Sequence, residues 1–214
     1  MPFVTKKPSH YFAALAQDST ESLHVGLYFG GSISDDTQND FKLLGRMIHQ
    51  TTRTIQCLWL RFRDGDESVV AAFGVFGNEL VGSKAILSLV FEGRLGTPEV
   101  QCLSGFLTCN ELRGIQFRRT NVDASTFSEL KPFFSQTNTL KVLDLSANPG
   151  FGDECITDVL HSLLDGGVPL ESLSLGEKFE GIPDEGRLLL SHGGISLIAT
   201  YISKSEYVSD SIYA

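Results

Sequence analysis

The sequence predicts an α/β solenoid, in which about six strand-helix units stack into a right-handed horseshoe with a concave parallel sheet and convex helices. Two observations predict this fold. A short apolar motif recurs along the chain at intervals of 26 to 31 residues, and segments between the motifs show helical periodicity. A repeat of this length is typical of units that bury their apolar faces only by stacking on one another.

The recurring motif has apolar residues at positions 1, 4 and 6 of a short segment, which fits one buried face of a strand. Five copies match in full, and a first copy has His24 at position 1. The copies begin at residues 24, 55, 86, 112, 140 and 170, so their spacings are 31, 31, 26, 28 and 30 residues. The predicted strands therefore lie near residues 24–29, 55–60, 86–91, 112–117, 140–145 and 170–175. The full triplets are Ile55, Leu58 and Leu60; Ile86, Leu89 and Phe91; Leu112, Ile115 and Phe117; Leu140, Leu143 and Leu145; Leu170, Leu173 and Leu175.

Helical spacing follows several of these motifs. Apolar residues three and four positions apart share one helix face in the segments 41–48, 100–107, 127–134 and 156–164. Asp123 and Asp153 stand where they would cap the free N–H groups of a first turn, and Gly166 and Gly167 predict the end of the last of these helices. Each repeat is therefore expected to be a strand followed by a helix.

One repeat carries a resemblance to a known family. Residues 140–148, Leu-Lys-Val-Leu-Asp-Leu-Ser-Ala-Asn, reproduce the pattern L-x-x-L-x-L-x-x-N. With the helix that follows and the 28- to 30-residue period, this segment resembles the ribonuclease-inhibitor-like class of leucine-rich repeats, and the resemblance covers nearly the whole chain from Tyr11 to Ile202. Only Asn148 supplies the motif's asparagine, because the other repeats have Arg63, Arg94, Thr120 and Lys178 there.

The pattern also predicts the domain organisation. We expect one repeat domain over residues 1–204 and a flexible tail over residues 205–214, with a partial seventh strand as the alternative for the tail. Residues 11–23 resemble the helix half of a repeat that feeds the first strand. Neither end shows a distinct capping unit, which favours a fragment of a longer array or ends covered by a partner.

Composition excludes several function classes. A net charge of −9 and a pI near 5.0 argue against nucleic-acid binding, which depends on clustered Lys and Arg. No apolar run is long enough for a membrane span, and no signal peptide is recognisable. The four cysteines contain no CxxC pair, so we expect reduced thiols in a cytoplasmic or nuclear protein.

No pattern of catalytic or metal-binding residues stands out. The turn Gly30-Gly31-Ser32 lacks the Lys-Ser/Thr pair of a phosphate-binding loop, and residues 64–67 lack the spacing of a calcium loop, so both are interpreted as turns. The histidines are scattered, with His24 expected at the edge of the core. The sequence therefore predicts no enzyme, no cofactor and no metal.

Candidate binding residues follow from strand geometry, because residues that alternate with buried ones face the opposite side of a sheet. Trp, Tyr and Arg are enriched at the energetic centres of protein interfaces. We place Trp59 between Tyr28 and Val90 on the exposed face, with burial under a helix or loop as its alternative. The fifth and seventh positions of the repeats supply the remaining members of the predicted partner-binding set: Tyr28, Trp59, Arg61, Val90, Glu92, Gln116, Arg118 and Asp144.

The functional prediction is a non-enzymatic module that binds a protein partner on its concave sheet. The resemblance implies two alternatives, since the family includes Ran-type activators of small GTPases and substrate receptors of ubiquitin ligases. The receptor role needs an amino-terminal adaptor-binding motif, which residues 1–10 are too short to supply.

Overall fold

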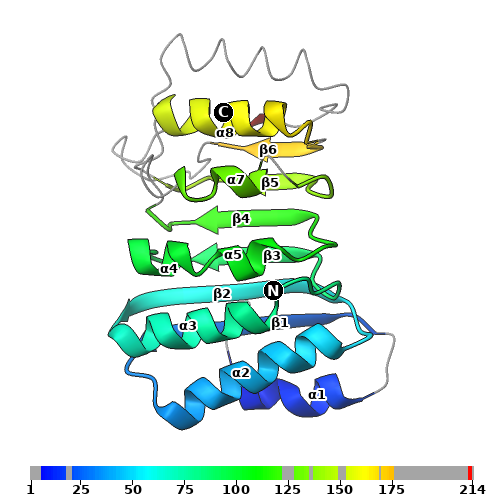
Figure 1. The fold of residues 1–214 in the computed structure, drawn as a ribbon, viewed down its shortest axis with the longest axis vertical. Coiled ribbons are helices and arrows are strands. Elements are labelled where there is room, and N and C mark those ends of the chain that lie inside the picture. Colours follow the sequence, from blue (N-terminus) through cyan, green and yellow to red (C-terminus); the bar gives the residue numbers. More distant parts are fainter. Residues whose placement is uncertain are drawn as a thin grey trace. The chain divides into compact units, whose positions relative to one another are not determined.

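A computed structural model describes residues 6–17, 21–121, 128–134, 137–148, 153–168, 170–175 and 212–213. Within these ranges parallel strands alternate with helices, so the fold is α/β (Figure 1). The chain divides into two compact units, Met1–Leu112 and Arg113–Ala214. The strand-helix alternation expected from the repeat is confirmed in each unit.

The first unit is a three-stranded parallel sheet with helices packed on one face. Strand β2 (Ile55–Gly65) pairs with β1 (Leu23–Gly31) on one side and with β3 (Ser88–Glu92) on the other. The connections are α2 (Asp35–Gln50) and α3 (Glu67–Glu79), and these two helices pack against each other. The remaining helical segments of this unit are η1 (Pro8–Tyr11), α1 (Phe12–Ala16), α4 (Thr97–Gln101) and α5 (Ser104–Leu107).

The core of the first unit lies between the sheet and its helices and is rich in phenylalanine. Phe29 of β1 stacks on Phe41 of α2, and Phe73 of α3 stacks on Phe106 of α5, each with ring centroids 4.5 Å apart. A Cβ atom on Gly105 would lie only 2.3 Å from the carbonyl oxygen of Gly77. The glycine is therefore needed for the close approach of α5 to α3.

The second unit repeats the parallel arrangement with shorter strands. Strand β5 (Val142–Asp144) pairs with β4 (Gly114–Arg118) and with β6 (Ser172–Ser174), which in turn pairs with β7 (Ile212–Tyr213). Helices α7 (Lys131–Phe134) and α8 (Asp153–Asp165) complete the described part of this unit. Residues 212 and 213 thus form the short strand that was the alternative to a flexible tail, because β6 offers them an edge for pairing.

The predicted strand positions are confirmed by burial. All five full triplets are buried, and no member is more than 2% exposed to solvent. The first copy differs, since His24 is exposed and the buried residues of β1 include Val25, Leu27 and Phe29. The expectation that His24 lies at the edge of the core was therefore wrong.

The predicted helices are confirmed in part. Phe41 in α2 and Ile156 in α8 face the core as expected. Helix α8 ends at Asp165, two residues before Gly167, whose φ of 60° is in the left-handed region. The predicted helix at 100–107 is divided into α4 and α5. Asp123 and Phe127 lie outside the described residues.

Helix α3 was not predicted from the sequence. Residues 64–67, which precede and begin it, were interpreted as a turn. Strand β2 instead continues to Gly65, and Asp66 caps α3 by accepting a hydrogen bond from the Ser68 backbone N–H at 2.9 Å. Apolar residues and glycines occupy most positions of α3 itself, so the helix lacks a clear polar face.

The outer edge of β1 is covered by the segment that precedes it. The Tyr11 hydroxyl donates to the Gly26 carbonyl at 3.0 Å and accepts from the Gly26 N–H at 2.9 Å. The Lys6 N–H also donates to the Gly26 carbonyl, and Arg53 donates to the Ala14 carbonyl at 2.7 Å. The expectation of no distinct cap was wrong for this edge, because single side chains form the cap without any periodic signal.

Candidate functional site

The face of the first sheet opposite α2 and α3 displays aromatic and cationic side chains. Tyr28 of β1 is 40% exposed, and the Arg61 side chain of β2 is 52% exposed. Trp59, two residues before Arg61, is partly exposed while its indole Nε1 is buried. With the exposed Arg63, these residues form what we call the aromatic–arginine surface: Tyr28, Trp59, Arg61 and Arg63.

The strand register corrects one predicted neighbour. Tyr28 pairs with Arg61, and Gly26 pairs with Trp59, whereas the sequence alignment placed Tyr28 beside Trp59. The error is a shift of two residues in β1. Such a shift keeps every side chain on its own face, so alternation of apolar residues cannot detect it.

Gly30 makes room for the Tyr28 ring. A Cβ atom on Gly30 would lie 2.7 Å from the Tyr28 hydroxyl oxygen and 3.0 Å from the Arg63 Cβ. The tyrosine therefore leans along its own strand over Gly30. Arg63 is absent from the predicted binding set, although its alternation with Trp59 and Arg61 would have placed it on this face.

The neighbouring strand β3 contributes less to this surface than expected. Val90 pairs with Trp59 as predicted but is only 8% exposed, so the expectation that it is displayed was wrong. The physical reason is size, because a valine next in register to a tryptophan is easily screened from solvent.

Arg61 keeps an accessible guanidinium. Its Nη2 lies 3.8 Å from Glu92 Oε1, and the glutamate side chain is 22% exposed. An ion pair of this length at a half-exposed site contributes about 1 kcal/mol or less. Glu92 therefore orients Arg61 without occupying all of its hydrogen-bond donors, of which a guanidinium has five.

The second unit has its own row of polar side chains on β4, β5 and β6. Gln116 pairs with Asp144, and Asp144 pairs with Ser174, as the repeat register predicts. Asp144 accepts hydrogen bonds from the Ser146 N–H at 3.0 Å and the Ser146 hydroxyl at 2.6 Å. Arg118, 52% exposed, has its Nε 3.7 Å from Asp144 Oδ2, so it remains open to solvent.

Asn148 binds the turn after β5 to the preceding repeat. Its Oδ1 accepts from the Thr120 N–H and hydroxyl, both at 2.9 Å. Its Nδ2 donates to the carbonyls of Phe117, Leu145 and Ser146 at 2.7, 2.9 and 3.1 Å. Asn148, the one asparagine that matches the repeat motif, therefore links this turn to residues 117 and 120 by hydrogen bonds.

The described residues include four histidines and one aspartate, Asp66, whose pKa is shifted. The four described histidines, His10, His24, His49 and His161, are exposed and lie on different elements. No group of three or more His, Cys, Asp or Glu side chains in the described part could hold a metal ion. Hydrogen bonds from the Ser68 and Ser32 side chains and the Ser68 backbone lower the pKa of Asp66, which is the cap of α3.

The four cysteines are free thiols. Burial raises the pKa of Cys109 to about 12. Burial, together with the nearby Glu99 carboxylate, also raises the pKa of Cys102. A raised pKa lowers the fraction of reactive thiolate, so neither residue has the properties of a nucleophile.

Within the described ranges, no helix is both long and apolar enough to cross a bilayer. In comparisons with known proteins, no family model matches the chain, and no curated protein is significantly similar to it. The candidate function therefore rests on the geometry of the exposed sheet face.

Proposed function

We propose that the chain is a non-enzymatic interaction module of the leucine-rich-repeat type, which binds a protein partner on the exposed face of its parallel strands. One observation carries the proposal: Tyr28, Trp59 and Arg61 lie together on the face of β1 and β2 opposite α2 and α3, where each is at least partly exposed. These are the residue types that most often dominate the free energy of protein association.

The aromatic–arginine surface is suited to binding because its parts are already ordered. Tyr28 and Arg61 are held by strands that pair in register, and Tyr28 rests over Gly30. A partner would therefore bury aromatic area without first ordering a loop, which reduces the entropy lost on association. Arg61 and Arg63 add cationic donors for carboxylates or carbonyls of the partner.

The repeat type and the solenoid are parts of the same proposal. The buried triplets and the contacts of Asn148 support a leucine-rich repeat, since both features are what its strand and turn require. A stack of such repeats presents one sheet face along its whole length. That arrangement would extend the binding surface over successive strands.

Affinity capture from the source cells, followed by titration with the purified partner, tests the proposal. We expect Tyr28→Ala and Arg61→Ala each to weaken binding by about 30-fold, the change typical of a dominant interface residue. Val81→Ala is the matched control, because Val81 is 50% exposed in the turn after α3. Equal binding by all three variants would overturn the proposal.

Trp59→Ala separates binding from stability. Weakened binding with an unchanged melting temperature supports an interface role, whereas a large drop in melting temperature indicates that the indole belongs to the core. If the captured partner is a small GTPase, stimulation of its GTP hydrolysis by the chain would replace the proposal with the GTPase-activator alternative.

A further inference from the structure

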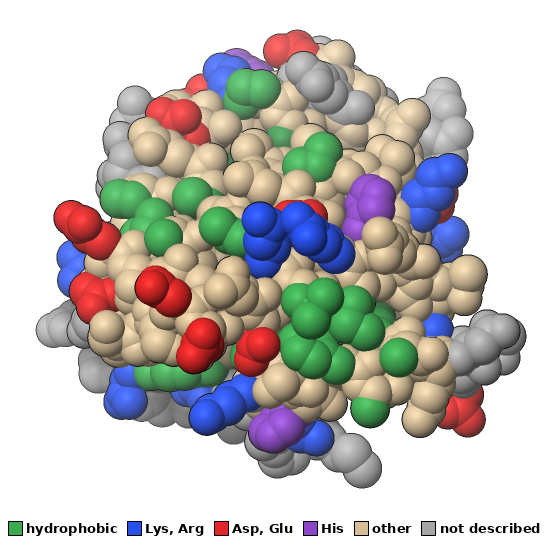
Figure 2. Space-filling model, turned by 60° about the horizontal axis from the view of Figure 1, so that its bottom comes forward, with side chains coloured by type: hydrophobic (Ala, Val, Ile, Leu, Met, Phe, Trp, Pro, Cys, Tyr) green, Lys and Arg blue, Asp and Glu red, His purple; other side chains and the backbone are tan. Residues whose placement is uncertain are grey.

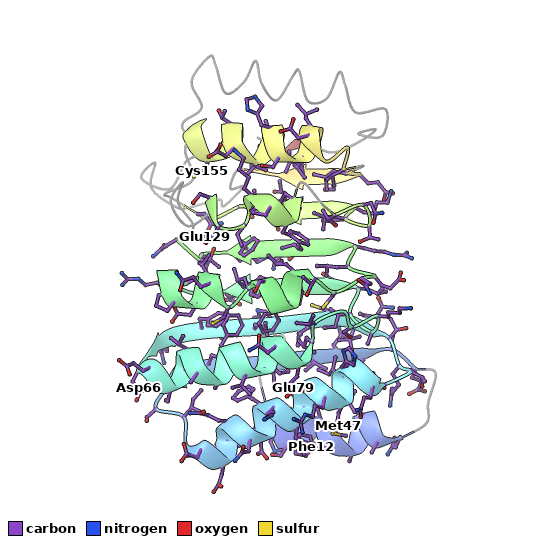
Figure 3. The ribbon with its side chains drawn as sticks, viewed as in Figure 1. Phe12, Met47, Asp66, Glu79, Glu129 and Cys155 are labelled. Atoms are coloured by element: carbon purple, nitrogen blue, oxygen red, sulfur yellow. The ribbon has the colours of Figure 1, made fainter. Side chains whose placement is uncertain are left out.

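The end of the first unit that α1 and α2 form carries an apolar patch. Leu43 of α2 is 46% exposed, and Met47 lies one turn further along the same side of the helix. Phe12 of α1, a helix that packs against α2, is also partly exposed. Figure 3 shows Phe12 and Met47 at this end of the unit, and Figure 2 shows apolar side chains gathered there. We call Phe12, Leu43 and Met47 the α1–α2 patch.

Charges on α2 change sign near the middle of the helix. Its first two turns carry three carboxylates, Asp35, Asp36 and Asp40. The following turns carry Lys42, which is exposed, and Arg46, which is 53% exposed and 3.1 Å from Glu79 of α3. In Figure 2 a group of acidic side chains lies to the left of the apolar patch and a basic group lies above it.

We infer that the α1–α2 patch binds a second copy of this chain, with the two α2 helices antiparallel about a two-fold axis near Leu43. In this arrangement the acidic half of each α2 faces the basic half of the other, and the apolar side chains meet between them. A parallel pairing would bring like charges together. A two-fold interface requires a single self-complementary surface, which the charge pattern of α2 supplies.

Hydrogen bonds hold the segment that contains α1 against the rest of the first unit. Arg53 Nη1 donates to the Ala14 carbonyl, and Arg53 Nε donates to the Glu21 carbonyl at 3.0 Å. Tyr11, next to α1, is bound to Gly26. Association therefore need not order α1. Three apolar side chains and their flanking charges make a small interface, so we expect a dissociation constant weaker than about 1 µM.

Sedimentation equilibrium of the full chain tests the inference, over about 5 to 500 µM to bracket this affinity. We expect the mass to rise with concentration from 23.4 kDa toward twice that value. Leu43→Glu should remain a monomer throughout, because it buries a charge at the contact. Val81→Glu, an equally exposed apolar position outside the patch, should associate like the unmodified chain. A monomeric unmodified chain, or dimerisation of Leu43→Glu, would overturn the inference.

A charge exchange tests the antiparallel arrangement. Lys42→Glu with Arg46→Glu gives a chain with an acidic α2, and Asp36→Lys with Asp40→Lys gives a chain with a basic α2. Each variant alone should lose self-association, and an equimolar mixture should recover it as a heterodimer. Circular dichroism melting shows whether each variant is folded. A folded pair that does not associate when mixed contradicts the proposed pairing, as does self-association of either variant alone. The inference uses different elements from the aromatic–arginine surface, so either one stands without the other.

Discussion

Replacing Asn148 with alanine should destabilise the second unit strongly. Asn148 is 7% exposed and makes five hydrogen-bond contacts. Its partner Thr120 is fully buried, so the Thr120 N–H and hydroxyl would each lose their asparagine acceptor. A buried polar group left unpaired costs about 1–3 kcal/mol. Two such groups give an expected loss of about 2–6 kcal/mol in the free energy of unfolding.

Urea denaturation measures this loss, and hydrogen exchange locates it. The amide of Thr120 should lose protection in Asn148→Ala, because its acceptor is the asparagine Oδ1. Asn110→Ala is the matched control, since Asn110 is exposed and its side chain donates a single bond of 3.3 Å to the Gly82 carbonyl. That control should lose about 1 kcal/mol or less. Equal destabilisation by the two substitutions would refute the assignment of Asn148 as the residue that holds this turn.

Three further changes test the packing of the first unit. Tyr11→Phe should lower stability at neutral pH by about 1–3 kcal/mol, because both Gly26 backbone groups lose a partner. Burial raises the pKa of Tyr11, so this contribution is full below the ordinary tyrosine pKa and is lost as pH rises through the raised value. The stability difference between the two proteins should therefore shrink above about pH 10, and a constant difference would contradict the burial of the hydroxyl. Cys109, with a pKa of about 12, should react with iodoacetamide at pH 8 more than about 1,000-fold slower than a free thiol of pKa 8.5, and rapid labelling in peptide maps of the folded chain would contradict this. Gly105→Ala should sharply lower the free energy of unfolding measured by thermal denaturation, because its Cβ would lie 2.3 Å from the Gly77 carbonyl oxygen. Gly82→Ala, with open space but a φ of 72°, should lower this free energy by only about 1 kcal/mol.

The repeat was predictable because burial imposes a period that a single sequence displays. Leu58 and Leu60 in β2 must be apolar at fixed spacing, as must Leu143 in β5 and Leu145 directly after it, and the structure buries each of them completely. Helix α3 was not predictable in this way. It is apolar on several sides and contains two glycines, so it lacks the polar face that marks an amphipathic helix.

The face of the sheet that each candidate residue occupies was predictable from the sequence, but the residues that lie beside it were not. Trp59 and Arg61 were placed on the correct strand and face by alternation alone. The partner of Tyr28 was wrong because a two-residue shift in β1 conserves alternation. The burial of Val90 and the position of the Tyr28 ring over Gly30 depend on side-chain packing between strands, which carries no signal in a repeat pattern.

The cap on β1 shows the same limit. Tyr11 and Arg53 are separated by more than forty residues, yet both hold the segment before β1 in place. Each side chain forms hydrogen bonds to backbone groups. Backbone groups do not depend on which amino acid carries them, so the sequence does not mark these contacts. No periodic or compositional pattern predicts such contacts.

The most direct test of a protein-binding sheet face is site-specific photo-cross-linking with p-benzoylphenylalanine. The probe replaces Tyr28 on the exposed sheet face in one protein and Val81 in the turn after α3 in another, at positions 40% and 50% exposed. We expect a covalent adduct with the captured partner from position 28 and none from position 81. An adduct from position 81 alone would contradict it.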